Sequence, residues 1–282
     1  MKKVLITGKN SFLGRTIISQ LQRSGDFEVQ ELDVKDDNWK KCDFSSFDVV
    51  INVAGIAHVN AKTIDSSLYY KVNHELSNDI AIKAVESGVG QLIYLSSMSV
   101  YGERTGRITV ETQPNPTNHY GKSKLLAENF LNRNIKNKLN LVILRPPMIY
   151  GKNCPGNYTK LVDFMKKVSV FPKVSNQRSM LYSGNLAIFI ENIINREASG
   201  LFYPQNKEYV NTYNMVKTVL SINGKQVISL PNFFCTFSAI RNVGIFKKII
   251  GDFYYDCPNP YSENFLDFNE SIRETEKEIT EV

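Results

Sequence analysis

The stretch NHYGKSKLLAENF places a tyrosine and a lysine, Tyr120 and Lys124, four residues apart. If the stretch is helical, this spacing sets both side chains on one face of the helix. An ammonium group beside a phenol favours the phenolate, so it lowers the pKa of the phenol from about 10 and makes tyrosine a usable acid or base. We therefore expect proton transfer here. The alternative is a surface tyrosine with a lysine neighbour, a spacing that often arises by chance.

Three hydroxyl groups follow the apolar run QLIYL, on Ser96, Ser97 and Ser99. A serine hydroxyl close to the phenol would hydrogen-bond the reacting oxygen of a substrate. The two stretches together predict a catalytic site, provided that the fold brings the end of this strand to the head of the tyrosine helix.

A glycine turn occupies LITGKNSFLGRTI, in which Gly8 follows an apolar run and Gly14 stands at the head of a helix-like stretch. Such a turn holds a pyrophosphate on the amides and dipole of the helix start. Ser11 stands where dinucleotide-binding turns have their middle glycine, although a small hydroxyl can fit there or donate a hydrogen bond. The turn predicts nucleotide binding, and an ordinary strand-to-helix corner is the alternative.

Asp33 ends the next strand-like run and could accept hydrogen bonds from the ribose hydroxyls of an adenosine, which favours NAD over NADP. Lys9 and Lys35 favour the opposite, and a strand-end cap is the structural alternative for Asp33. We predict NAD as the cofactor, with NADP possible.

The elements that must position these residues alternate along the first half of the chain. Short apolar runs such as KVLIT, FDVVINVAG, QLIYLSS and NLVILRPP are separated by helix-like stretches. This rhythm predicts an α/β fold with a doubly wound parallel sheet, in which ligands lie beyond the carboxyl ends of the strands. After Gly151 the pattern fades, and we expect a smaller lobe with helices near 158–167, 186–195, 213–221 and 237–250. The charged end, ESIRETEKEITEV, is expected to fray.

Composition narrows the function classes. The 282 residues carry a formal charge of +6, but the basic residues are scattered, which predicts no nucleic-acid partner. Apolar runs are shorter than the roughly 18 residues of a membrane span, which predicts no membrane insertion. Four cysteines lie far apart, so we expect no metal site, reduced thiols and a cytoplasmic protein.

Taken together, the motifs resemble the extended short-chain dehydrogenase/reductase (NAD-dependent epimerase/dehydratase) family. The matching stretches, in the family's order, are TGKNSFLG, KCDF, NVAG, YYKVN, LSSMSVYG, YGKSK, LRPPMIYG and QRSMLYS. The resemblance implies a Rossmann-like NAD(P)-binding domain over residues 1–150. It also implies that residues 151–282 form mainly a substrate-binding lobe, with some segments returning to the sheet.

The resemblance also implies roles for single residues. Tyr120 is the expected acid/base, Lys124 modifies its pKa and binds a ribose, and Ser97 polarises the substrate oxygen. Arg178 is expected on the diphosphate of a sugar nucleotide, with a surface arginine as its alternative. The expected substrate-binding residues are Ser97, Ser99, Asn157 and Arg178. The expected cofactor-binding residues are Gly8, Asn10, Ser11, Phe12, Leu13, Gly14, Asp33, Asp43, Ala54, Gly55, Asn73, Tyr120, Lys124 and Pro146.

The later motifs resemble nucleotide-sugar reductases and epimerases of bacterial capsular polysaccharide synthesis. They imply action at C4 of a UDP-linked, N-acetylated hexose, with reduction of a 4-keto-6-deoxy sugar placed ahead of a UDP-glucose or UDP-N-acetylglucosamine 4-epimerase. A dehydratase is disfavoured because Met98 and Ser99 follow Ser97, where dehydratases have an acid pair. Ser11 is the best support for a non-catalytic nucleotide-sensing protein, and the intact set of Ser97, Tyr120 and Lys124 argues against it.

Members of this family commonly dimerise through the helix that carries the tyrosine and lysine. The resemblance therefore predicts a homodimer. The apolar residues of that stretch could contribute, although core packing explains them equally well: Leu125, Leu126, Phe130 and Leu131.

Overall fold

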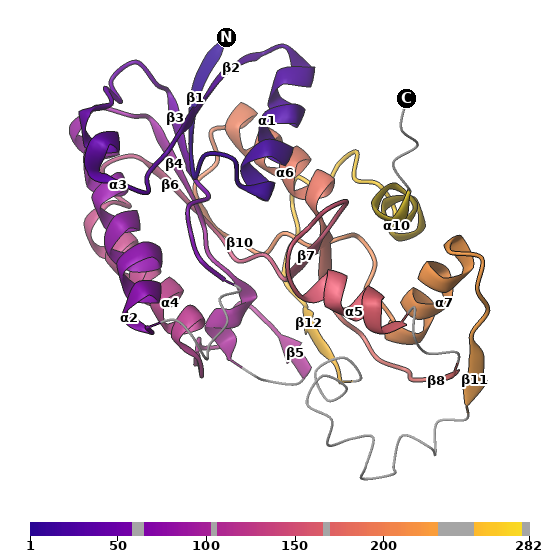
Figure 1. Ribbon diagram of the computed structural model, residues 1–282. Helices are drawn as coiled ribbons and strands as arrows, with labels where there is room; N and C mark the ends of the chain where they lie inside the picture. The colour runs from indigo at the N-terminus through magenta and orange to yellow at the C-terminus, as the bar shows by residue number, and fades with distance from the viewer. Residues whose placement is uncertain (58–64, 103–105, 166–169, 231–250, 278–282) are drawn as a thin grey trace.

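The computed structural model describes residues 1–57, 65–102, 106–165, 170–230 and 251–277 (Figure 1). Its centre is a six-stranded sheet in the order β10-β6-β4-β3-β1-β2, and every neighbouring pair is parallel. The strands are β1 (Lys2–Thr7), β2 (Phe27–Leu32), β3 (Val49–Asn52), β4 (Gln91–Leu95), β6 (Asn140–Leu144) and β10 (Gly200–Phe202). The predicted α/β fold with a parallel, Rossmann-like sheet is confirmed.

The strand register explains why the apolar runs are continuous. In β3 and β4 all residues are buried, because both faces of the sheet are covered by helices. One row across the sheet faces one helix layer and consists of Leu5, Val50, Leu92 and Leu141. The neighbouring row faces the other layer and consists of Ile6, Ile51, Ile93 and Val142.

Two helices pack on each face of the sheet. The first layer consists of α1 (Phe12–Ser24) and α6 (Ser183–Asn195), which contact each other. The second layer consists of α3 (Leu76–Glu86) and α4 (His119–Asn134), preceded by α2 (Ser67–Tyr70) and a π-helical turn, η2 (Lys71–Glu75). Between β2 and β3 the described chain has only a 3₁₀ turn, η1 (Asp37–Lys41), which the buried Trp39 anchors.

A second lobe lies beside the sheet, around a core of its own. Its helices are α5 (Asn157–Met165), α7 (Thr212–Ile222) and α10 (Phe268–Glu276). Its strand pairs are β7 (Met148–Tyr150) with β9 (Met180–Tyr182), and β8 (Val170–Pro172) with β11 (Ile228–Leu230). A third pair, β5 (Gly106–Ile108) with β12 (Phe253–Tyr255), lies below the sheet in Figure 1. The segment 183–202, which forms α6 and β10, returns to the large sheet.

The expected helices near 158–167, 186–195 and 213–221 correspond to α5, α6 and α7, whereas 237–250 lies outside the described residues. The expectation that the charged end frays is wrong for residues 270–276, which belong to α10 (Phe268–Glu276). Asp267 and Glu270 form a capping box at its start, and Ile272 is buried in the lobe core. Among the helices of the described residues, none has the length and apolar character needed to cross a bilayer.

Candidate active site

The glycine turn lies where β1, β2 and β3 end. Gly8 has a φ of 88°, and a Cβ at this position would lie 3.2 Å from the Cα and N atoms of Ala54. Its N–H group donates to the Leu32 carbonyl at 3.0 Å. Asn10 has a φ of 63°, and its N–H group donates to the Glu31 carboxylate at 3.3 Å. A side chain at Gly8 would be both strained and crowded, so the turn presents bare backbone, as a phosphate-binding turn must.

Ser11 is the N-cap of α1. Its Oγ atom accepts a hydrogen bond from the Gly14 N–H group at 3.0 Å, and serine is among the strongest N-cap residues. Its φ of −69° and ψ of 151° are extended backbone that any residue adopts. Phe12 and Leu13 follow in the first turn of the helix. Ser11 therefore serves the helix start, and the turn does not require glycine at this position.

This role gives a prediction for Ser11. Ser11→Ala is expected to lower the free energy of unfolding by about 1 kcal/mol, because one N–H group of the first turn loses its partner, whereas Ser11→Gly costs a few tenths. Urea denaturation of the two variants measures the difference. An alanine variant as stable as the glycine variant would show that the cap contributes nothing.

The two acids among the predicted cofactor-binding residues, Asp33 and Asp43, each close a local turn. Asp33 directly follows β2, and its Oδ1 atom accepts from the Lys35 N–H group at 3.0 Å. Asp43 accepts from both the N–H group and the hydroxyl of Ser45 at 2.9 Å, and these hydrogen bonds hold the pKa of Asp43 below its usual value. Both side chains belong to exposed residues. A turn-capping role is thus visible for each, and contact with a cofactor stays a prediction.

Asn73 supports the segment that follows β3. Its Oδ1 atom accepts from the Ile56 N–H group at 2.9 Å, and its Nδ2 atom donates to the Ile56 carbonyl at 3.0 Å and to the Ser123 hydroxyl at 3.1 Å. A Cβ on Gly55 would lie 3.0 Å from the same Oδ1 atom. The buried amide of Asn73 is used within the protein, where it joins residues 54–56 to α4.

Ser97 and Tyr120 meet at the carboxyl edge of the sheet. Ser97 caps the 3₁₀ turn η3 (Met98–Tyr101), since its Oγ atom accepts from the Ser99 N–H group at 3.1 Å. Tyr120 is the second residue of α4, whose N-cap Asn118 accepts from Gly121 at 2.8 Å. The Ser97 hydroxyl acts on the Tyr120 phenol, whose pKa it lowers against the effect of burial. The structure thus brings together the hydroxyl and the phenol that the sequence predicts.

Gly121 permits this approach. A Cβ on Gly121 would overlap the Ser99 carbonyl oxygen and would lie 3.0 Å from the Cβ atom of Pro116. The head of α4 can therefore lie against η3 only with glycine next to the tyrosine. This contact fixes the position of Tyr120 relative to Ser97.

Lys124 lies one turn further along α4 and is almost fully buried, with 4% of its surface exposed. Its Nζ atom donates to the Leu95 carbonyl at 2.7 Å and lies 4.7 Å from the centre of the Tyr94 ring. A Cβ on Gly55 would lie 3.2 Å from Nζ. Burial lowers the pKa of Lys124 to about 7, an effect that the charge of Glu128 opposes.

One expectation about Tyr120 needs correction. The sequence predicts that Lys124 lowers the pKa of the phenol, whereas burial raises the pKa of Tyr120, and the Ser97 side chain only partly opposes this. The Lys124 amine donates to the Leu95 carbonyl at the end of β4. Without a ligand, the phenol is therefore held in its protonated form.

Pro146 lies where the ends of β4 and β6 meet the 3₁₀ turn η3. Its carbonyl oxygen accepts from the Met98 N–H group at 2.9 Å, and the Ser96 N–H group donates to the Leu144 carbonyl at 2.8 Å. Pro146 itself is buried. The predicted cofactor residue Pro146 therefore lies beside the start of η3.

Arg178 belongs to the second lobe and is half-buried. Its backbone pairs with Val210, its Nη1 atom donates to the Gly251 carbonyl at 2.9 Å, and its guanidinium lies 6.0 Å from the centre of the Phe253 ring. Burial lowers the pKa of Arg178 to about 10, which the charge of Asp252 opposes. No carboxylate of the described residues forms an ion pair with it. A guanidinium in this setting suits an anionic ligand.

The remaining predicted substrate residues lie on both lobes. Ser99 is half-buried in η3. The strand β12, with which Arg178 pairs, connects the two lobes here, because the ring of its Tyr255 lies 6.2 Å from the ring of Tyr101 at the end of η3. Asn157 is the first residue of α5, but its side chain lies outside the described residues.

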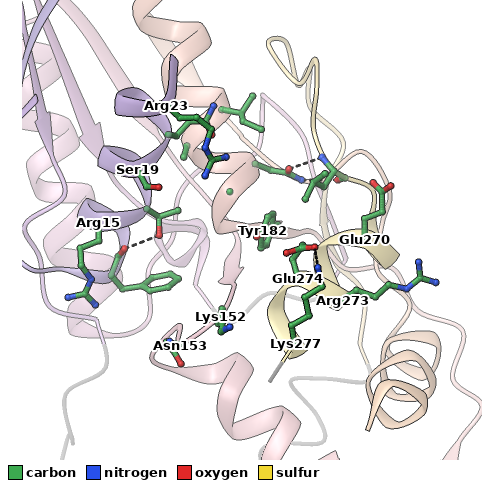
Figure 2. Close-up of a pocket in the computed structure, with 18 residues that line it drawn as sticks. Arg15, Ser19, Arg23, Lys152, Asn153, Tyr182, Glu270, Arg273, Glu274 and Lys277 are labelled. Carbon is green, nitrogen blue, oxygen red and sulfur yellow. Dashed lines mark hydrogen bonds and ion pairs between the residues drawn. The ribbon is translucent and has the colours of Figure 1, made fainter. Parts of the chain in front are cut away.

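A cleft of about 870 Å³ lies between α1, α6 and α10 (Figure 2). Phe12 is its one residue from the predicted cofactor set, and its lining contains none of the three predicted catalytic residues. In Figure 2, Arg15 and Arg273 lie on opposite sides of the cleft, and Glu274 pairs with Lys277 at 2.5 Å. This cleft is therefore separate from the predicted catalytic site.

Sequence reasoning missed Glu128 and Arg145, which form an ion pair next to the site with a 2.5 Å contact. Glu128 follows Lys124 by four residues, and that helical spacing was a usable signal. Glu128 on α4 can reach Arg145, which directly follows β6, because β6 lies beside β4 in the sheet. This strand order cannot be predicted from the residues around Glu128.

Residues 1–232 match the family described as RmlD substrate binding domain. Among curated relatives, the UDP-glucose 4-epimerase of Vibrio cholerae is 29% identical over 82% of this chain and 78% of its own length. The N-acetyl-α-D-glucosaminyl-diphospho-ditrans,octacis-undecaprenol 4-epimerase of Escherichia coli O157:H7 is 28% identical over 80% and 74%.

Solved structures match nearly the whole chain. The UDP-N-acetylglucosamine 4-epimerase of Bacillus cereus has a TM-score of 0.75 at 18% identity and covers 98% of both chains. The dTDP-4-dehydrorhamnose reductase of Clostridium acetobutylicum has a TM-score of 0.71 at 24% identity and covers 97% of this chain and 98% of its own. At these identities the likeness shows the fold.

Proposed function

Because this chain belongs to the RmlD substrate binding domain family, we propose that it is an NAD(P)-dependent nucleotide-sugar oxidoreductase or epimerase that acts at C4 of a UDP-linked hexose. One observation carries the proposal: Ser97 and Tyr120 lie together at the carboxyl edge of the sheet, where Gly121 lets the head of α4 lie against η3, and Lys124 is buried one helical turn further along. Such an edge is where ligands bind in open α/β sheets.

The chain's own residues supply the proton chemistry. Tyr120 donates or accepts the proton of the substrate hydroxyl, because its phenol lies at the edge of the site. Ser97 orients the reacting oxygen through its hydroxyl. Lys124 places a positive charge near the phenol when it is protonated. A bound nicotinamide supplies or accepts the hydride.

The glycine turn fits a dinucleotide. The bare backbone at Gly8, where a Cβ would meet Ala54, leaves room for a pyrophosphate at the start of α1. Among the solved structures with this fold, one 4-epimerase is in complex with NAD and one reductase is in complex with NADP. We propose NAD, with NADP possible, because Asp33 directly follows β2, where a carboxylate binds ribose hydroxyls.

For the substrate, we propose a UDP-linked and N-acetylated hexose. The half-buried Arg178 would bind the diphosphate, and Ser99 and Asn157 would contact the sugar side. Reduction of a 4-keto-6-deoxy sugar is the first candidate, because a dTDP-4-dehydrorhamnose reductase is among the matching folds. 4-Epimerisation is the second, because the curated relatives named above are 4-epimerases. Surface polysaccharide synthesis is the proposed context.

Two assays test the proposal. We expect the purified protein either to oxidise NAD(P)H in the presence of UDP-4-keto-6-deoxy-N-acetylglucosamine, or to convert UDP-N-acetylglucosamine to its C4 epimer without net change of the cofactor. Absorbance at the NAD(P)H band follows the first reaction, and NMR of the sugar anomeric proton follows the second. Turnover of neither substrate by folded protein would contradict action at C4.

We also propose a homodimer. Leu68 on α2, Ile82 on α3 and Leu126 on α4 expose 36%, 39% and 43% of their surfaces, and these helices lie on one face of the sheet. Light scattering is expected to give twice the chain mass of 32.1 kDa, and Leu126→Glu is expected to halve it. A monomeric mass for the wild-type protein would contradict this proposal.

The proposed location is the cytoplasm. Cys42, Cys154 and Cys257 are free thiols, which supports a reducing compartment; Cys235 lies outside the described residues.

A further inference from the structure

A buried ion pair lies directly behind the proposed catalytic residues. The side chains of Glu128 and Arg145 are 2% and 8% exposed. The Nε atom of Arg145 lies 3.1 and 3.2 Å from the two carboxylate oxygens of Glu128, and its Nη2 atom lies 2.5 Å from Oε2. This bidentate geometry is the strong form of an arginine–carboxylate pair.

The pair is hydrogen-bonded to the elements that hold the site. The Ser96 hydroxyl, next to Ser97, donates to Glu128. Arg145 donates to the Tyr101 hydroxyl at 2.6 Å, at the far end of η3. Arg145 also directly precedes Pro146. One cluster therefore links β4, η3, α4 and β6 where each of them meets the site.

Stability alone is a weak explanation for such a pair. Moving two charges into the interior carries a desolvation cost, and the attraction between the charges often does no more than offset it. Apolar residues of similar volume can therefore replace such a pair without a loss of stability. For Arg145, burial disfavours the charge, but the hydrogen bonds and the attraction of Glu128 outweigh it and raise its pKa. The position of the cluster points to a role in the site.

The charge of Glu128 reaches Lys124. The groups that face Lys124 are the Tyr94 ring from β4, the Leu95 carbonyl and, from the segment after β3, Gly55. None of these carries a charge, and Tyr120 is protonated. Within the described residues, Glu128 is the charged group whose attraction opposes the loss of the Lys124 proton.

We propose that Glu128, held by Arg145, is a positioning residue, which fixes the Ser97 turn against α4 and keeps a negative charge near the Lys124 ammonium. The inference deepens the proposed function and rests on it. Glu128 acts through Lys124 and Ser96 and does not touch the substrate. Arg145 holds the carboxylate in one orientation.

A direct test measures the Lys124 amine without any substrate. In protein labelled with ¹⁵N at the lysine ζ position, the Lys124 signal is assigned by its absence from Lys124→Met, and its pKa is followed by NMR. Glu128→Gln is expected to lower this pKa by about one unit or more, and Glu128→Asp to leave it close to the wild-type value. An unchanged pKa in Glu128→Gln would overturn the proposal.

The second readout is the pH dependence of kcat/KM with the substrate that the wild-type protein turns over. Glu128→Gln is expected to move the alkaline limb to lower pH, so that at pH 8 the rate falls by about tenfold. An alkaline limb that does not move would show that the pair is merely structural. If the wild-type protein turns over neither UDP-sugar, the proposed function fails, and the NMR titration still decides the role of Glu128.

Loss of one charge can impair folding, because it leaves Arg145 buried without its partner. The double variant Glu128→Leu with Arg145→Met removes both charges and is expected to fold, yet to show the lowered Lys124 pKa. Gln91→Met is the matched control. Gln91 is buried at the other end of β4, where it donates to the Ala198 carbonyl at 2.8 Å, so this variant should leave the Lys124 pKa unchanged.

Discussion

Tyr120→Phe is expected to lower turnover of the UDP-sugar by about 10³-fold while NAD(P)H binding stays within about twofold of the wild-type value. The change removes one hydroxyl group, which the Ser97 side chain influences, and leaves the ring against Tyr69 at a centroid distance of 6.5 Å. Positioned proton transfer contributes factors of about 10² to 10⁴ to enzymatic rates. Stopped-assay kinetics give the turnover, and quenching of protein fluorescence gives the binding constant.

A matched change elsewhere separates the chemistry from the loss of a hydroxyl. Tyr209 lies in the second lobe, where its hydroxyl donates to the Tyr255 carbonyl at 2.9 Å and its side chain is 39% exposed. Tyr209→Phe is expected to leave turnover unchanged. If Tyr120→Phe also retains full turnover, the assignment of Tyr120 as acid/base is wrong. If the wild-type protein binds cofactor but turns over neither substrate, the nucleotide-sensing alternative gains support instead.

The fold could be predicted because its signal is local. Four buried strands with continuous apolar runs, separated by helix-length stretches, fit a parallel sheet covered on both faces and few other arrangements. The spacing of Tyr120 and Lys124 likewise predicted a shared helical face, and both lie on α4. Periodicity is enough to predict a strand or a shared helical face, because both depend on residues that are close together in the sequence.

The contacts of the site depend on partners that are distant in the sequence. Helical spacing places Lys124 near Tyr120 but does not reveal that its amine donates to the Leu95 carbonyl, since this acceptor lies 29 residues away. Burial, which the spacing does not reveal either, raises the pKa of Tyr120 that the sequence predicted to be lowered. At Ser11 the contact is local, because its Oγ atom accepts a hydrogen bond from Gly14 three residues on. There the sequence suggested a lost glycine, although serine before a helix also predicts an N-cap.

Composition misled at the carboxyl end for a related reason. The segment around Glu270 is strongly charged, and charge alone predicts fraying. One apolar residue, Ile272, enters the core of the second lobe, and the Asp267 cap fixes where the helix starts. A few residues with tertiary contacts thus outweighed the average character of the segment.

Lys124→Met is expected to lower turnover and, below neutral pH, to make the protein more stable. Turnover should fall by about 10²-fold or more, because the variant has no cation near the phenol. In the wild-type protein, burial lowers the pKa of Lys124 to about 7, whereas an unfolded lysine has a pKa of about 10.4. Between these two pKa values the unfolded chain binds more protons than the folded chain, so the free energy of unfolding rises with pH. The buried amine of Lys124 therefore destabilises the folded protein most below pH 7.

The size of the effect follows from that gap. A difference of about three pKa units corresponds to roughly 4 kcal/mol of folding free energy that the buried amine costs and the variant regains. The variant also leaves the Leu95 carbonyl without its donor, which lowers its free energy of unfolding by about 1–3 kcal/mol. The net gain in the free energy of unfolding is then about 1–3 kcal/mol at pH 7 or below, and it should shrink and then reverse as the pH approaches 10.4. Urea denaturation of variant and wild type at several pH values measures this difference.

The matched control is Lys122→Met on the same helix, where the side chain is exposed. Its stability relative to the wild type should not change with pH, because an exposed lysine has no desolvation to lose. A pH-independent difference for Lys124→Met would show that the amine is not desolvated in the folded protein. The expected combination, a gain in stability with a loss of turnover, places Lys124 among residues kept at a cost to folding, which is typical of positions that serve a site rather than the core.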